Sequence, residues 1–448
     1  MSDANLALGA SSDLRQELMA QLRSARAQTD QLFQIVRPES LYDRPIPERH
    51  RIIFYLGHLE AFDWNLIARQ VLGLPSFHPT FDKLFAFGID PVGGDLPDDP
   101  ASDWPARQEI DQYNARIRQT LDEAVLRATI TDPHFPLLHR GFIFHVAIEH
   151  RLMHAETLAY MLHQMPVERK LAMSTPAPPA ADAVVPRMAV IPAGQATLGR
   201  PRAAGGDFGW DNEYQVHTVR VPEFAIDAYN VTNRQFIDFM LSGGYDKREL
   251  WDDEGWEWKT KKGIYHPHFW MRRYDAWFQR NMFGEVSLPL DWPVYVSHAE
   301  ATAYVRWAGK ALPTEAQFHR AAYGTPDGAE REFPWGNEFS NSPRGNFDFQ
   351  RWDPAPVSAY PDGASAFGVH GLLGNGWEWT STPFGPFDGF QAFPFYPGYS
   401  ADFFDGKHYV LKGGSARTAA CFLRRSFRNW FQPRYPYPYA TFRGVVNR

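Results

Sequence analysis

The sequence predicts an α + (α+β) protein in which a four-helix bundle precedes a larger, irregular domain. In the first part of the chain, apolar residues recur at helical spacing. In the second part, short segments rich in Gly, Pro and Trp alternate with loops. A stretch at 166–186 contains Ser-Thr-Pro-Ala-Pro-Pro-Ala-Ala and is typical of a linker. We therefore expect a helical domain at 10–165 and a second domain at 187–448.

Four helices are expected in the first domain. Their predicted spans are 14–36, 49–72, 106–126 and 142–163. The connection at 75–105 is rich in Pro, Gly and Asp and is too long for a simple turn, and such connections are often functional. In the second domain, helices are expected at 233–241 and 298–308. Metal sites in helix bundles are built from side chains on facing helices, so a metal site is expected in the first domain.

Composition excludes several functional classes. The formal charge of −7 and a pI near 6.1 disfavour nonspecific nucleic-acid binding. The single cysteine, Cys421, excludes an internal disulfide framework and a Cys-rich metal site. No apolar run reaches membrane-spanning length, and residues 1–8 lack the pattern of a secretion signal. We therefore expect a cytoplasmic protein, with neither nucleic acid nor a membrane as partner.

Three histidines form the candidate metal site. His150 and His154 lie four residues apart in the predicted helix 142–163, so their rings share one face, one turn apart. His58, on the predicted helix 49–72, would supply a third imidazole and leave open metal positions for a substrate and dioxygen. The pair alone is equally compatible with helix histidines that are satisfied by carboxylates. Glu156 points to another face, as a hydrogen-bond acceptor behind the ligands or a structural ion pair.

Motifs of the second domain carry a resemblance to a known family. Gly374–Thr380 reads Gly-Asn-Gly-Trp-Glu-Trp-Thr, Lys412–Ser415 reads Lys-Gly-Gly-Ser, and Phe-Arg-Gly occupies 442–444. These motifs resemble the formylglycine-generating-enzyme/sulfatase-modifying-factor family, whose fold is related to C-type lectins. The three histidines fall where the DinB-like superfamily places its metal triad. Formylglycine-generating activity is set aside, because Thr418 and Leu423 occupy the positions of its two catalytic cysteines.

The two domains in this order resemble the ergothioneine-biosynthesis sulfoxide synthases. That resemblance implies a mononuclear non-haem Fe(II) enzyme that uses O2 to join a sulfur or selenium donor to imidazole C2 of hercynine (Nα-trimethylhistidine). The resemblance further implies that the second domain completes the substrate pocket. It also implies that Asn429 and Trp430 contact hercynine, and an aromatic face suits a quaternary ammonium through cation–π attraction.

The chain departs from that family at substrate positions. Phe431 and Tyr435 replace a carboxylate and an arginine that hold an amino-acid donor, and Arg434 is the nearest substitute for the lost charge. Met153 stands where the family has glutamine. Phe384 and Phe387 stand where that family usually has two tyrosines, one of them the proton donor, and we expect them to line the pocket. Tyr396 and Tyr399 are then the candidates for the proton donor.

These departures resemble the selenoneine synthase branch, in which a selenosugar joins hercynine through a C–Se bond and a selenoxide forms on the way to selenoneine. One alternative is an ergothioneine-type synthase with cysteine, γ-glutamylcysteine or a thiosugar as donor. A second is a DinB-like metal-dependent thiol transferase without redox chemistry, and a third is a noncatalytic sugar-binding protein. A monomer and a homodimer both remain open.

Overall fold

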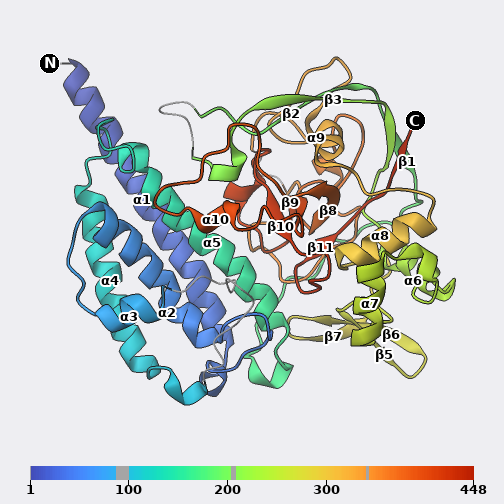
Figure 1. Cartoon of the computed structure of the whole chain (residues 1–448), viewed down its shortest axis with the longest axis horizontal. Coiled ribbons are helices and arrows are strands. Elements are labelled where there is room, and N and C mark those ends of the chain that lie inside the picture. Colours follow the sequence, from blue (N-terminus) through green and yellow to red (C-terminus); the bar gives the residue numbers. More distant parts are fainter. Residues whose placement is uncertain (1, 87–99, 203–207, 340–342) are drawn as a thin grey trace. The chain divides into compact units, whose positions relative to one another are not determined.

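The computed structural model describes residues 2–86, 100–202, 208–339 and 343–448. The chain forms two compact units, Met1–Met173 and Ser174–Arg448. Among the described residues, no helix is long and apolar enough to cross a membrane. The order of a helical unit followed by a unit with several sheets confirms the predicted fold class (Figure 1).

Four long helices build the first unit: α1 (Ser2–Ile35), α2 (Ile52–Asp63), α4 (Arg107–Arg127) and α5 (Phe142–His163). α1 packs along α5, and α2 packs along α4 (Figure 1). The bounds of α5 agree with the sequence prediction, whereas α1 begins well before residue 14. The connection predicted at 75–105 contains a short helix, α3 (Pro79–Leu84), and its residues 87–99 lie outside the described part of the chain.

The second predicted helix, 49–72, is wrong in its bounds and its type. α2 begins only at Ile52, and from Trp64 to Val71 the chain continues as a π-helix, labelled η2. A bond from the amide of Leu72 to the carbonyl of Ile67, 2.9 Å long, shows the i→i+5 pattern. Apolar periodicity does not distinguish these two kinds of winding over eight residues, so the change was not visible in the sequence.

α2 is buried on nearly all sides. Within it, Phe62 is the one residue that is not buried. Along α5, most residues from Ile143 onward are also buried. A helix that is apolar all round belongs in the interior, and any polar side chain on it must find a partner there. His58, His150 and His154 are on these two helices.

The second unit is built around a four-stranded sheet of order β10-β9-β8-β11. β8 is antiparallel to β9 and parallel to β11. The strands of this sheet are β8 (Gly376–Pro383), β9 (Tyr409–Gly414), β10 (Asn429–Phe431) and β11 (Ala440–Thr441). Trp377 and Trp379 of β8 are buried, so the Gly- and Trp-rich motif forms the centre of the sheet.

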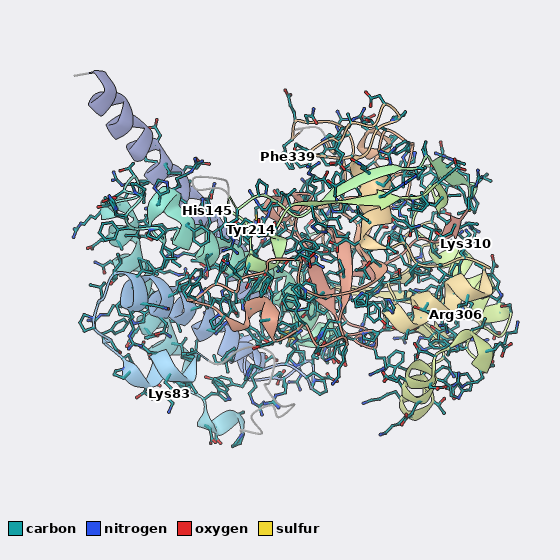
Figure 2. The ribbon with its side chains drawn as sticks, turned by 45° about the horizontal axis from the view of Figure 1, so that its top comes forward. Lys83, His145, Tyr214, Arg306, Lys310 and Phe339 are labelled. Atoms are coloured by element: carbon teal, nitrogen blue, oxygen red, sulfur yellow. The ribbon has the colours of Figure 1, made fainter. Side chains whose placement is uncertain are left out.

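Three smaller sheets surround this centre, of orders β1-β4-β12, β2-β3 and β5-β6-β7. Their strands are β1 (Met188–Ile191), β2 (Gly194–Leu198), β3 (His217–Val221), β4 (Phe224–Asp227), β5 (Trp270–Arg273), β6 (Ala276–Asn281), β7 (Gly284–Ser287) and β12 (Val445–Asn447). Lys310, labelled in Figure 2, pairs with Asp227 of β4 at 2.6 Å. The other carboxylate oxygen of Asp227 accepts from the Gly444 amide, which ties β12 to this sheet.

Helices α6 (Asn233–Leu241) and α8 (His298–Trp307) form where the sequence predicts them. α7 (Asp253–Lys262), α9 (Glu315–Tyr323) and the short α10 (Gly398–Ala401) were not predicted. α9 carries a detectable signal, because Thr314 and Gln317 form a capping box: the Thr314 side chain accepts from the Gln317 amide. That Thr-x-x-Gln pattern is a sequence-level mark of a helix start.

Candidate metal centre and substrate-binding residues

The structure brings His58 of α2 together with His150 and His154 of α5. One ring nitrogen from each lies within 4.8 Å of the other two. The Nε2 atoms of His150 and His154 are 3.1 Å apart. All three side chains are buried, and no carboxylate takes part in the cluster. Among the described residues, this is the one group of three or more His, Cys, Asp or Glu side chains with such spacing.

His58 is held in one orientation. Its Nδ1 lies 2.7 Å from the carbonyl oxygen of Phe85, which can only accept, so Nδ1 carries the proton. Nε2 of His58 therefore has the lone pair, and it is buried without a hydrogen-bond partner among the described residues. A buried unpaired acceptor is costly. A neutral imidazole nitrogen with a second hydrogen-bonded nitrogen is the usual form of a histidine metal ligand, so the triad fits a metal ion.

The pKa values of the triad favour the neutral imidazole. Burial lowers the pKa of His58 to about 4, in spite of its bond to the Phe85 carbonyl. Burial also lowers the pKa of His150 and of His154 far below the usual value, and their neighbouring rings and Arg151 act in the same direction. At neutral pH the three rings are uncharged, so a metal ion does not have to displace protons from them.

Aromatic rings pack against two histidines of the triad. Phe54 stacks on His58, with ring centroids 4.9 Å apart, and Phe62 stacks on His150 at 3.5 Å. Phe85 also packs against α2 at Gly57, where a Cβ atom would lie 2.6 Å from ring atoms. The absence of a side chain at Gly57 therefore lets the Phe85 segment come close enough to meet His58. Neither Gly57 nor Phe85 was among the predicted site residues.

The two remaining predicted residues of the helical unit, Met153 and Glu156, lie on α5 and are partly exposed. The acceptor found behind His58 is the backbone carbonyl of Phe85. A backbone acceptor has no sequence signature, which is why it was missed. A substrate contact by Met153 and a supporting role for Glu156 remain predictions.

In the second unit, Trp430 of β10 lies within an aromatic cluster. Phe384 stacks on it almost in parallel, at 4.3 Å and 7°. Tyr399 and Phe403 each lie 5.5 Å from it. The neighbouring Asn429 uses its side-chain oxygen to accept from the Trp430 amide at 2.9 Å. Trp430 and Asn429 are both partly exposed, so this cluster has an accessible edge.

Arg428 orders the loop that carries two of the predicted pocket residues. It donates to the carbonyl of Gly385 at 2.9 Å and to Glu315 at 3.1 Å. Its guanidinium carbon lies 4.1 Å from the ring centre of Phe387 and 5.1 Å from that of Phe384. Arg428 is buried and its charge is balanced by Glu315, so its role in this unit is to hold the 384–387 loop beside β10.

Phe431 and Tyr435 form a second aromatic surface. Their rings stack at 5.6 Å and 7°, and both are partly exposed. Tyr437 meets Tyr435 edge-on at 4.9 Å. Arg434 lies between the two in sequence, but it forms an ion pair with Glu254, so its charge is already balanced.

The two candidate proton donors differ in their contacts. Tyr399 is buried, stacks on Trp210 at 4.0 Å and meets Trp430 edge-on. Tyr396 lies 5.6 Å from Tyr399 and is partly exposed. Tyr399 is thus the candidate in direct contact with a predicted hercynine residue.

Two family models match the chain. Residues 174–448 match the sulfatase-modifying factor enzyme 1-like domain, and residues 21–158 match the DinB superfamily. The first match covers more than half of the chain, which therefore belongs to the sulfatase-modifying factor enzyme 1-like family.

Particular relatives match the chain over different shares of its length. The chain is 38% identical to the hercynine oxygenase of Mycolicibacterium smegmatis, over 65% of this chain and 69% of that protein. It is 28% identical to ergothioneine biosynthesis protein 1 of Neurospora crassa, over 92% of this chain and 55% of that longer protein. It is 34% identical to the formylglycine-generating enzyme of Thermomonospora curvata, over 43% of this chain and 70% of that protein. Its similarity to these relatives shows that the chain is an enzyme.

Proposed function

We propose that this enzyme uses a ferrous ion and O2 to join a sulfur or selenium donor to C2 of the hercynine imidazole. The observation that carries the proposal is the convergence of three buried imidazoles, with Nε2 of His58 left unpaired. The similarity to a hercynine oxygenase supports hercynine as the acceptor. His58, His150 and His154 would hold the ion, which when bound supplies O2 activation and a site for the anionic donor.

The reaction balances without a further reductant. The C2–H and S–H (or Se–H) bonds break, a C–S or C–Se bond forms, and the chalcogen is oxidised to a sulfoxide or selenoxide. These changes remove four electrons, which reduce one O2. One oxygen atom ends on the chalcogen and the other in water, together with the two hydrogens. Since the three ligands are neutral, the ion keeps its full charge, which favours binding of a thiolate or selenolate.

The chain's own residues then bind and orient hercynine. We assign the trimethylammonium group to the cluster around Trp430, because aromatic faces attract a quaternary ammonium. We assign the hercynine carboxylate to the side-chain NH2 of Asn429, since the oxygen of that amide is used by the Trp430 backbone. Tyr399 is the preferred candidate for holding a proton beside this cluster.

Two kinds of sulfur or selenium donor are candidates for the second substrate. The relationship to ergothioneine biosynthesis protein 1 favours a thiol. The stacked pair of Phe431 and Tyr435 favours a neutral donor with a sugar face, because neither side chain is charged and Arg434 already pairs with Glu254. A selenosugar or thiosugar fits this second observation, and cysteine or γ-glutamylcysteine fits the first.

Mass spectrometry of the products separates these candidates. Iron is loaded anaerobically, hercynine and O2 are added, and selenoglucose, thioglucose, cysteine and γ-glutamylcysteine are supplied in parallel. A selenium-containing hercynine adduct from the sugar alone supports the selenosugar, and a sulfoxide from an amino-acid thiol supports the ergothioneine-type reaction. Activity that persists with Zn2+ and without O2 would contradict oxidative coupling and indicate a thiol transferase.

A further inference from the structure

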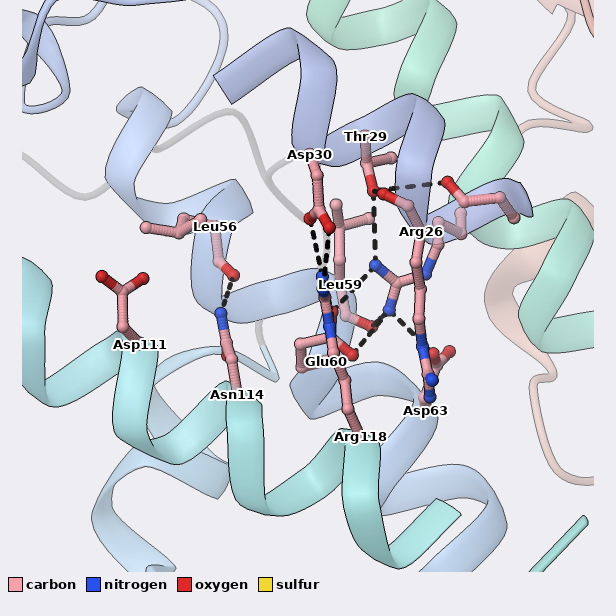
Figure 3. Close-up of polar contacts among 12 residues, drawn as sticks. Arg26, Thr29, Asp30, Leu56, Leu59, Glu60, Asp63, Asp111, Asn114 and Arg118 are labelled. Carbon is pink, nitrogen blue, oxygen red and sulfur yellow. Dashed lines mark hydrogen bonds and ion pairs between the residues drawn. The ribbon is translucent and has the colours of Figure 1, made fainter. Parts of the chain in front are cut away.

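Arg151 lies between the predicted ligands His150 and His154 in the sequence, and its side chain is fully buried. Its guanidinium donates hydrogen bonds to both carboxylate oxygens of Glu60, at 3.0 and 2.8 Å, and to one carboxylate oxygen of Asp63 at 2.8 Å. Figure 3 labels Glu60 and Asp63, the two acidic residues that accept from the Arg151 guanidinium. Arg151 is on α5, whereas Glu60 and Asp63 are on α2, so the contacts join the two helices that carry the histidines.

The same guanidinium also binds the backbone of α2. Its Nη2 donates to the carbonyl of Leu59 at 3.0 Å. Leu59 directly follows His58, and Arg151 directly follows His150. The planar guanidinium of Arg151 therefore connects α5, directly after His150, with the backbone of α2, directly after His58. Because that group is rigid, it restricts both the spacing and the register of α2 against α5.

A wider network supports this clamp. Glu60 also accepts from Arg118 of α4 at 2.8 Å, and Arg118 binds both oxygens of Asp30 on α1 at 2.7 Å (Figure 3). Although burial acts to raise the pKa of Glu60, the charges of Arg151 and Arg118 hold it below its usual value. Glu60 is thus a carboxylate shared by two arginines, of which Arg151 alone reaches the backbone beside His58 in the bonds described.

Stability alone does not account for such a network. Burying charged groups costs so much solvation that apolar side chains of similar volume are often as stabilising or more so. What the guanidinium adds is a defined geometry, because its donors match several acceptors at once.

We propose that Arg151 is a positioning residue of the metal centre. By clamping Leu59 and Glu60 to α5, it sets the distance between Nε2 of His58 and the His150–His154 pair. This inference rests on the proposed function only in that the triad holds a metal ion. It requires neither hercynine nor a particular donor.

The test compares two arginine-to-lysine variants of the full chain, with Co2+ as the probe. Arg151→Lys keeps the charge but cannot reach Glu60, Asp63 and the Leu59 carbonyl together. Arg118→Lys is the matched control, because it makes the same chemical change at the other partner of Glu60, without contact to the α2 backbone in the bonds described. Affinity is measured by titration of the metal-free protein, and the visible Co2+ spectrum reports ligand geometry. Thermal unfolding of each variant tests whether it folds.

Arg151→Lys is expected to weaken Co2+ binding about 10- to 100-fold, as for other residues behind metal ligands, and to change the spectrum. Arg118→Lys is expected to retain the wild-type affinity and spectrum, even where its melting temperature falls. Equal affinity in wild type and Arg151→Lys would overturn the inference, as would equal weakening in both variants. If Arg151→Lys does not fold, Arg151→Gln replaces it, because the shorter amide cannot reach Glu60 and the Leu59 carbonyl together, and an unchanged affinity and spectrum there would overturn the inference.

Failure of the inference is distinguishable from failure of the proposed function. A wild-type protein that binds no Co2+ would overturn both. A wild-type protein that binds Co2+ and forms no hercynine product would overturn the proposed function alone. The positioning role would then still be decided by the two variants.

Discussion

The carbonyl oxygen of Phe85 accepts a hydrogen bond from Nδ1 of His58 at 2.7 Å, and this contact turns Nε2 of His58 toward the other two histidines. The approach depends on Gly57, because a side chain there would meet the Phe85 ring. One backbone carbonyl therefore determines both the tautomer and the direction of a predicted ligand.

Replacing Gly57 by alanine should displace Phe85 and loosen His58. The new Cβ would lie 2.6 Å from ring atoms, so the ring must move. We expect a loss of stability of about 1–3 kcal/mol, as for other overpacked interiors, together with weaker Co2+ binding. Denaturant unfolding and metal titration measure the two effects. Gly284→Ala is the control, since a Cβ there would meet no atom within 4 Å. Wild-type metal affinity in Gly57→Ala would contradict this account of His58.

Metal binding should stabilise the helical unit through His58. An ion that binds only the folded state adds about 2.7 kcal/mol when its free concentration is a hundred times the dissociation constant. We expect Co2+ to raise the melting temperature of the wild type and to leave that of His58→Ala unchanged, and EDTA should reverse the shift. An equal rise in both proteins would show that the ion binds elsewhere.

Stability of the second unit should fall in mild acid because of His298. Burial lowers its pKa to about 4, although its bond to the Thr380 carbonyl acts in the opposite direction. In the unfolded chain the pKa is near 6.5, so below that pH the unfolded state binds the proton and the native state does not. Stability is therefore lost as pH falls from 6.5 toward 4, and the loss from His298 should reach about 2 kcal/mol at pH 5.

The matched variant for His298 is His298→Gln, whose amide still donates to a carbonyl but does not titrate in this range. Urea unfolding at pH 7.5 and pH 5 should show a smaller loss of stability in the variant than in the wild type. The same loss in both would mean that other groups dominate the pH dependence.

Phe431 and Tyr435 should govern the choice of donor. The double change Phe431→Asp and Tyr435→Arg removes the stacked surface and restores the charges expected for an amino-acid donor. We expect kcat/KM for a sugar donor to fall about tenfold, the scale of one aromatic stacking contact, and turnover of cysteine or γ-glutamylcysteine to rise. Phe431→Leu controls for loss of the ring without added charge. Unchanged donor preference in the double variant would exclude this surface as the donor site.

Much of the helical unit could be predicted because its signals are local. Apolar periodicity located α5 to its exact bounds, and the four-residue spacing placed His150 and His154 on one face. Other signals were present but not used, such as the Thr314–Gln317 capping box that begins α9. The π-helix after α2 had no such signal, because its wider turns leave no distinct pattern in eight residues.

The sequence by itself determined the two domain types, the helix that carries the His-x-x-x-His pair, and the aromatic replacements at Phe431 and Tyr435. These features depend on residues that are close in the chain. Only the tertiary structure decided that His58 meets that pair, that the Phe85 carbonyl orients it, and that Arg151 clamps α2 to α5. Those relationships join residues 27 and about 90 positions apart through packing and backbone groups, and a backbone carbonyl has the same chemistry in every residue.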